Sequence, residues 1–107
     1  MAPTLGDGQV VVVSRHAYRR RKPRRGELVA ARPRPLQGTA MVKRLAGLPH
    51  DRITVSGRHW QLGDDQYFLL GDRADDSLDS RRLGPMSREE LIGPLCARLW
   101  PPTFFCA

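Results

Sequence analysis

Short runs of β-prone residues, separated by Gly and Pro, follow one another along most of the chain. The 107 residues include 10 Gly and 9 Pro, which fall at short intervals and divide the chain into brief elements. The segments rich in strand-favouring residues are 9–14, 28–31, 41–46, 53–55, 58–61, 66–70 and 95–100. Ser56-Gly57, between two of them, predicts a tight hairpin turn. The pattern predicts a mainly β fold of short strands.

One small helix and one connector interrupt this pattern. Ser87-Arg88-Glu89-Glu90 fits a capping box, in which the first and last residues satisfy each other's backbone N–H groups. Gly93-Pro94 predicts the end of that helix after about one and a half turns. Arg32-Pro33-Arg34-Pro35 disfavours helix and sheet, so we expect an extended connector there. No long helical pattern alternates with the strands, which argues against a parallel α/β fold.

Length and hydropathy indicate a single domain over residues 1–107. A chain of this size can form one modest core, and its hydrophobic fraction of 40% is ordinary for a globular protein. The longest aliphatic run, Val10 to Val13, is far shorter than the roughly 20 residues that a membrane-spanning helix needs.

The positive charge is concentrated in one segment. The chain has 18 Lys and Arg against 11 Asp and Glu, a formal net charge of +7. Residues 15–34, within a basic loop region predicted over 15–40, contain half of the basic residues and a single acid, Glu27. Such a run is a candidate contact for anionic lipid headgroups or other phosphates, and a solvated loop is the plainer alternative. A small basic β-barrel that binds nucleic acid would need interleaved aromatic residues; only Tyr18 lies there, so no nucleic acid is expected.

The cysteines and acids do not predict a metal site or a cofactor. Cys96 and Cys106 have no Cys-x-x-Cys partner and no His at ligand spacing. We expect free thiols, with a disulfide as the alternative in an oxidising compartment. The acid-rich segment 71–81 lacks the spacing of a calcium loop.

Lys43 is a candidate catalytic residue because of its place in a predicted strand. Met41, Lys43 and Leu45 share one face of that strand, and Val42 and Arg44 share the other. A lysine between apolar neighbours on an inward face is desolvated, which disfavours its charged form. A neutral lysine can act as a general base for a serine hydroxyl. The alternative is that Lys43 faces outward and Arg44 forms the inward pair.

The segment from Gly71 to Arg81 is a second candidate. It reads Gly-Asp-Arg-Ala-Asp-Asp-Ser-Leu-Asp-Ser-Arg, a composition that favours local hydrogen bonds between side chains and backbone. Asp79 and Arg81 are placed to form an ion pair that fixes its shape. Taken alone, the segment predicts an ordered turn.

Together with the start of the chain, these segments resemble the type I signal peptidases, serine endopeptidases with a Ser-Lys dyad. The matching motifs occur in the family's order: Met1–Leu5, Gly8–Val13, Arg25–Val29, Val42–Asp51 and Gly71–Arg81. The departures are Gln9 for a usual Asp, His50 for a Gly, and Arg73 for an Asn.

The resemblance implies roles for individual residues. Lys43 corresponds to the general base, and Ser77 corresponds to the hydroxyl that orients it. Asp79 and Arg81 correspond to the structural ion pair behind the dyad, and Asp72 supports the same segment.

The resemblance also implies a substrate and a location. Met1, Leu5, Met41 and Val42 would line shallow pockets for small residues such as Ala. The substrate, a peptide segment of an exported precursor, would bind extended as an added strand, so that pocket size selects the cleavage site. The expected place of action is the outer face of the bacterial cell membrane.

The family's nucleophilic serine stands immediately before the position of Met1. We therefore expect that the true start lies upstream, with the serine and a membrane anchor encoded there. The alternative is an inactive relic. LexA-like repressors also use a Ser-Lys dyad, but their helical DNA-binding domain has no counterpart in this sequence.

Overall fold

The structure, a computed structural model, describes residues 4–5, 9–72, 78–100 and 102–104, with side chains described over 12–72 and 78–96. Its nine strands in the described residues are β1 (Thr4–Leu5), β2 (Gln9–Val13), β3 (Leu28–Ala31), β4 (Met41–Gly47), β5 (Arg52–Val55), β6 (Arg58–Gln61), β7 (Phe68–Leu70), β8 (Leu91–Trp100) and β9 (Pro102–Phe104). The helices are single turns, α1 (Ala17–Arg20) and α2 (Ser80–Leu83), with 3₁₀ turns at Arg34–Leu36 and Arg88–Glu90. The predicted mainly β fold is confirmed.

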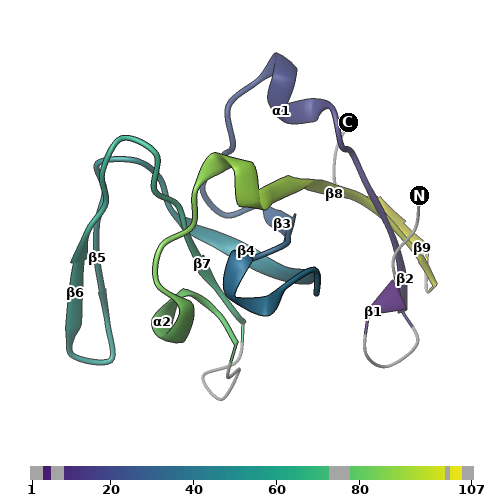
Figure 1. Cartoon of the computed structure of the whole chain (residues 1–107). Coiled ribbons are helices and arrows are strands. Elements are labelled where there is room, and N and C mark those ends of the chain that lie inside the picture. The colour runs from purple at the N-terminus through teal and green to yellow at the C-terminus, as the bar shows by residue number, and fades with distance from the viewer. Residues whose placement is uncertain (1–3, 6–8, 73–77, 101, 105–107) are drawn as a thin grey trace.

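All strand pairs are antiparallel, and one long strand connects the sheet (Figure 1). The strand order is β1-β2-β8-β3-β4-β7, with β9 also paired to β8. The first part of β8 pairs with β3, and the part from Leu95 to Trp100 pairs with β2. The strands β5 and β6 form a separate two-stranded ribbon.

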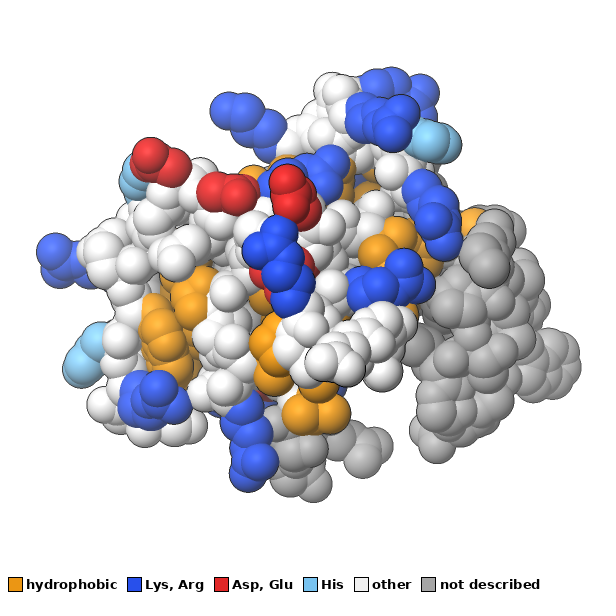
Figure 2. All heavy atoms as spheres, viewed as in Figure 1, with side chains coloured by type: hydrophobic (Ala, Val, Ile, Leu, Met, Phe, Trp, Pro, Cys, Tyr) orange, Lys and Arg blue, Asp and Glu red, His pale blue; other side chains and the backbone are white. Residues whose placement is uncertain are grey.

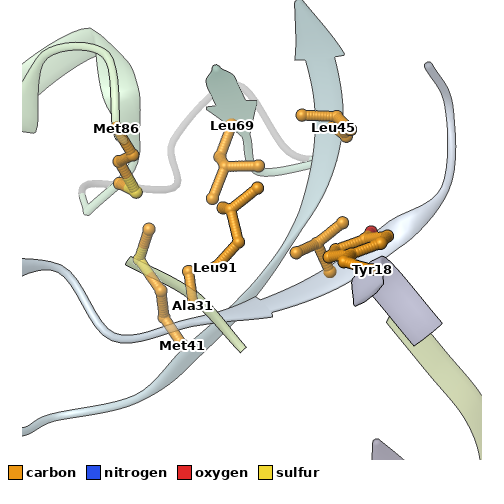
Figure 3. Close-up of a cluster of buried hydrophobic side chains, with 8 residues drawn as sticks. Tyr18, Ala31, Met41, Leu45, Leu69, Met86 and Leu91 are labelled. Carbon is orange, nitrogen blue, oxygen red and sulfur yellow. The ribbon is translucent and has the colours of Figure 1, made fainter. Parts of the chain in front are cut away.

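The main core covers one face of β3, β4, β7 and β8 (Figure 3). In strands, alternate residues point to the same face, and the members of the main core on β3 (Val29, Ala31) and β4 (Met41, Leu45) follow that period. Each large side chain buried in this way contributes roughly 1.5–3 kcal/mol. The cluster consists of Tyr18, Val29, Ala31, Met41, Leu45, Leu69, Met86 and Leu91.

The β5–β6 hairpin turns where the sequence predicted. Ser56 and Gly57 have φ values of 53° and 76°, as a two-residue hairpin turn with both central residues at positive φ requires. The ring of Trp60 packs against Phe68 of β7, with a centroid distance of 4.7 Å. This contact attaches the ribbon to the main sheet.

The prediction of an extended connector over Arg32–Pro35 is wrong in its second half. Pro33 is extended, with φ −62° and ψ 138°, but a 3₁₀ turn follows over Arg34–Leu36. The N–H of Leu36 donates to the carbonyl oxygen of Pro33 at 3.1 Å. A proline φ near −65° also suits the first turn of a helix, so the two prolines do not decide between these states.

The predicted helix after Ser87 is also shorter than expected. The capping box forms, but it closes only the 3₁₀ turn Arg88–Glu90, and β8 begins at Leu91. Gly93 and Pro94 therefore lie inside a strand instead of ending a helix. The pairing of β8 with β3 and β2 overrides the local helix-stop signal, and the two α-helical turns that do form, α1 and α2, were not predicted.

The region 15–40 is not a loop throughout. It contains α1, β3 and the first 3₁₀ turn. Tyr18 of α1 and Val29 of β3 are buried in the main core. These apolar side chains hold the segment on the sheet while most basic side chains between them remain exposed.

Candidate active site

Lys43 lies near the middle of β4, on the face that β4 turns toward the main core. It pairs with Val29 of β3, and its neighbours on the same face, Met41 and Leu45, are buried. Lys43 itself is half-buried, whereas Arg44 on the opposite face is exposed. The backbone thus places the lysine at the margin of the core, beside apolar side chains.

The Gly71–Arg81 segment begins next to this lysine. Arg44 of β4 pairs with Leu70, the last residue of β7. In an antiparallel pair the next residues along are Lys43 and Gly71. The register therefore brings the beginning of the segment beside the lysine.

Asp79 lies near the other end of the Gly71–Arg81 segment and connects the two ends. Its side chain is fully buried, and Oδ2 accepts hydrogen bonds from the backbone N–H of Gly71 at 2.9 Å and from Nη2 of Arg81 at 2.7 Å. Oδ1 accepts from the backbone N–H of Arg81 at 2.9 Å. Burial alone would raise the pKa of Asp79, but these hydrogen bonds outweigh it and lower the pKa below its usual range. Asp79 is thus a charged structural anchor.

Asp72 connects the segment to β4. Its two carboxylate oxygens accept hydrogen bonds from Nε and Nη2 of Arg44 at 2.9 and 3.0 Å, and Nη1 of Arg44 donates to the carbonyl oxygen of Gly26 at 2.8 Å. The hydrogen bonds from Arg44 lower the pKa of Asp72, and the positive charges of Arg44 and Lys43 add to the effect. The segment therefore places a carboxylate within electrostatic range of the Lys43 side chain.

Ser80 is a structural residue of this site to which sequence reasoning assigned no role. Its side chain is fully buried, and its Oγ accepts a hydrogen bond from the backbone N–H of Leu69 at 2.9 Å. β7 ends the strand order of the described residues, and there Ser80 and Asp79 accept hydrogen bonds from the backbone N–H groups of Leu69 and Gly71. The partner of Ser80 lies eleven positions away, and no spacing rule connects the two.

The predicted substrate-binding residues are distributed over several places. Met41 is buried in the main core, and Val42 packs on the opposite face of β4 against Ala30 and Leu95. Leu5 lies on β1, which β2, β8 and β3 separate from β4 in the strand order. Met1 and Ser77 lie outside the described residues. The roles assigned to these residues remain predictions.

The edge of β4 at Met41 and Val42, before the pairing with β7 begins, is the described backbone best placed to receive a peptide. The ladder between β4 and β7 starts at Arg44 and runs toward Gly47. On that side of β4, no strand among the described residues pairs with Met41 or Val42. An extended peptide could add a strand there, directly beside Lys43.

A cavity of about 440 Å³ lies elsewhere on the surface. None of the predicted site residues with described side chains lines it; its lining residues are Lys22, Pro23, Leu48, Pro49, His50, Asp64 and Tyr67. Among the described residues, no helix has the length and apolar character needed to cross a bilayer.

Comparison with known proteins agrees with the sequence motifs. The family model described as signal peptidase, peptidase S26, matches residues 1–61 and 55–100. "Probable signal peptidase I-2" of Synechocystis sp. is 32% identical over 129 residues, which cover 94% of this chain and 59% of that protein. Mitochondrial inner membrane protease subunit 1 of Xenopus tropicalis is 30% identical over 110 residues, with 94% of this chain and 64% of that protein covered.

The matches to the family model extend over nearly the whole chain. The chain therefore belongs to the signal peptidase family, peptidase S26. It spans between 59% and 64% of the length of the relatives from Synechocystis, Leptolyngbya laminosa and Xenopus tropicalis.

Proposed function

We propose that this domain is the catalytic part of a serine endopeptidase that uses a Ser-Lys dyad. The observation that carries the proposal is the position of Lys43. This lysine is half-buried on the core face of β4, beside Gly71, whose backbone N–H donates to the buried carboxylate of Asp79. In this proposal the nucleophile is a serine directly before Met1, as in the family pattern. The hydroxyl of Ser77 orients the lysine amine.

The reaction proceeds in two steps. The uncharged amine of Lys43 takes the proton of the serine hydroxyl as the serine oxygen attacks the scissile carbonyl carbon. The C–N bond then breaks, and the lysine passes the proton to the leaving amine. In the second step Lys43 takes a proton from water, which attacks the acyl-enzyme ester and releases the carboxylate product with return of the proton to the serine. A bound peptide excludes water from the lysine, which favours its uncharged form.

The substrate in this proposal is an extended segment of an exported precursor, cleaved after small residues. The side of β4 at Met41 and Val42 that faces away from β3, where no strand of the described part of the chain pairs, would supply main-chain hydrogen bonds to it. Shallow pockets, to which the family pattern assigns Met1, Leu5, Met41 and Val42, would exclude larger side chains by overlap. The names of the bacterial relatives, signal peptidases I, support this substrate class.

An activity assay tests the dyad and separates it from the alternative of an inactive relic. A polypeptide with serine placed directly before Met1 is expected to cleave a precursor with an Ala-x-Ala site, and Lys43→Ala is expected to lower the rate at least about 10²–10⁴-fold. Lys22→Ala, assayed on the same precursor in water-soluble form and without lipid, is the matched control, because Lys22 and Lys43 are the two lysines of the chain. Equal cleavage by the Lys43→Ala variant would overturn the dyad, and no cleavage by the folded serine-bearing polypeptide would support the relic.

We also propose that the domain works against a membrane, with residues 15–34 facing anionic headgroups. The location proposed is the outer face of a bacterial membrane; the family also includes proteases named for the mitochondrial inner membrane. Co-sedimentation with phosphatidylglycerol vesicles is expected to exceed that with neutral phosphatidylcholine vesicles. Equal binding to both would refute the electrostatic contact.

A further inference from the structure

The basic residues of segment 15–34 are not equivalent in the structure. The guanidinium groups of Arg21, Arg25 and Arg34 are neutralised by ion pairs with Glu27, Asp51 and Glu89, at N···O distances of 2.9, 2.6 and 2.7 Å. Five others are exposed and form no ion pair with a carboxylate of the described residues: Arg19, Arg20, Lys22, Arg24 and Arg32. Arg32 follows β3 and donates to the carbonyl oxygen of Gly38 at 3.2 Å. We call the other four, which lie on α1 and directly after it, the α1 basic face. Figure 2 shows Lys and Arg side chains gathered over α1.

The backbone that carries the α1 basic face is anchored to the core between its cations. Tyr18, directly before Arg19, and Pro23, between Lys22 and Arg24, are buried. The exposed cations of the face therefore alternate along the chain with buried residues. The hydroxyl of Tyr18 donates to Oε1 of Glu27 at 2.5 Å, and the backbone N–H of Arg24 donates to the same oxygen at 2.9 Å. The face is thus built onto the fold and is not a free polycationic tail.

Two arginines from different elements also contact the ring of Tyr18: Arg21 at the end of α1 and Arg88 of the second 3₁₀ turn. The guanidinium carbons of Arg21 and Arg88 lie 5.5 and 5.1 Å from the ring centroid, within the range of cation–π contacts. Arg21 additionally donates from Nη2 to Oε2 of Glu27 at 2.9 Å. These contacts engage Arg21 and Arg88, whereas the four cations of the face are exposed.

We infer that the α1 basic face, and not the whole 15–34 segment, is the surface that docks on an anionic lipid bilayer. The inference rests on the membrane contact proposed above and adds its location. A bilayer is favoured over a nucleic acid because Tyr18, the one aromatic residue of segment 15–34, is buried and offers no stacking platform. Headgroup attraction needs only several cations near one plane.

Charge-matched variants test the location. Arg19→Gln/Arg20→Gln removes two cations of the face, and Arg32→Gln/Arg52→Gln removes two exposed arginines outside it, so both doubles have the same net charge. Arg32 donates to the carbonyl oxygen of Gly38 and Arg52 to Oε1 of Gln61, with no ion pair among the described residues. Each cation near a bilayer contributes about fivefold to binding, so we expect a loss of roughly 25-fold for the first double and less than about threefold for the second.

The measurement is binding to mixed phosphatidylglycerol and phosphatidylcholine vesicles across a salt series, with thermal unfolding showing that each variant is folded. Equal losses in both doubles would overturn the location while leaving the membrane contact intact. No binding of the unmodified chain, or tighter binding to single-stranded DNA at the same salt, would overturn both. Peptidase activity of the serine-bearing polypeptide on a water-soluble precursor is a separate readout, so failure of the docking surface is distinguishable from failure of the dyad.

Discussion

The buried carboxylate of Asp79 accepts a hydrogen bond from the backbone N–H of Gly71 at 2.9 Å, and so joins two points of the chain eight residues apart. The same carboxylate holds the guanidinium of Arg81. One side chain therefore ties Gly71, directly after β7, to Asp79 and Arg81 at the start of α2. Together with the pairing of β4 with β7 and the hydrogen bonds from Arg44 to Asp72, this anchor holds the beginning of the Gly71–Arg81 segment beside Lys43.

Asp79→Asn is expected to destabilise the fold strongly. An amide cannot balance the charge of Arg81, whose side chain is 18% exposed, and its NH₂ group cannot accept from the surrounding donors. Breaking a buried ion pair on one side costs roughly 3–5 kcal/mol, measurable by urea unfolding at pH 7. Asp72→Asn is the control, because its pair with Arg44 is largely exposed and such pairs contribute about 0–1 kcal/mol. Equal losses in the two variants would contradict the anchoring role of Asp79.

Acid is expected to destabilise the domain partly through Glu27. Burial opposes its ionisation, but hydrogen bonds from Arg21, Tyr18 and the backbone of Arg24 prevail and lower the pKa of Glu27. The folded state therefore binds its proton only at lower pH than the unfolded state does, so the stabilisation is complete above the ordinary glutamate pKa of about 4.3 and is lost as pH falls below it. Urea unfolding from pH 7 to 3 should show Glu27→Gln less stable than the unmodified chain at pH 7, with the difference shrinking toward pH 3. A difference that stays constant with pH would exclude this linkage.

The local sequence pattern predicted the features that depend on residues close together in the chain. The boundaries of β3 and β6 follow directly from runs of strand-favouring residues. The period of two also placed Lys43 on the face of Met41 and Leu45. The Asp79–Arg81 ion pair joins residues two positions apart, which is why composition alone suggested it.

Contacts between distant segments could not be predicted in the same way. Arg44 and Asp72 are 28 positions apart, and only the pairing of β4 with β7 brings them together. The failed prediction at Gly93-Pro94 has the same origin, because a helix-stop signal carries no information about a strand that passes close by. Sequence motifs identified the segments of the candidate site, and the sheet register determines how the described parts meet.

His50→Gly is expected to stabilise the domain by about 0.5–1 kcal/mol. His50 has φ 73°, a left-handed conformation that costs an L-residue with a Cβ atom more than it costs glycine. The family pattern has glycine at this position. His50→Ala is the matched comparison: it also removes the contact between Nε2 and Oδ1 of Asp64 at 3.1 Å, but keeps the Cβ. Urea unfolding should rank the glycine variant above the alanine variant, and the reverse order would show that backbone strain is not the deciding term.

Gly93→Ala is expected to prevent normal packing of β8 against the end of β2. A Cβ atom at position 93 would lie 1.9 Å from the carbonyl oxygen of Ser14. That oxygen belongs to the backbone, and the N–H of Ser14 is held by the carbonyl oxygen of Pro94 at 3.0 Å, so the chains must separate to relieve the overlap. Overpacking typically costs about 1–3 kcal/mol, and the overlap with a backbone atom places this substitution at the upper end of that range or above it. Gly63→Ala is the control because its nearest neighbour, Oε1 of Gln66, would be 3.5 Å away, an ordinary contact. Thermal unfolding should show a large loss for Gly93→Ala and little change for Gly63→Ala; a well-folded Gly93→Ala protein would mean that β8 and β2 are not fixed at this distance.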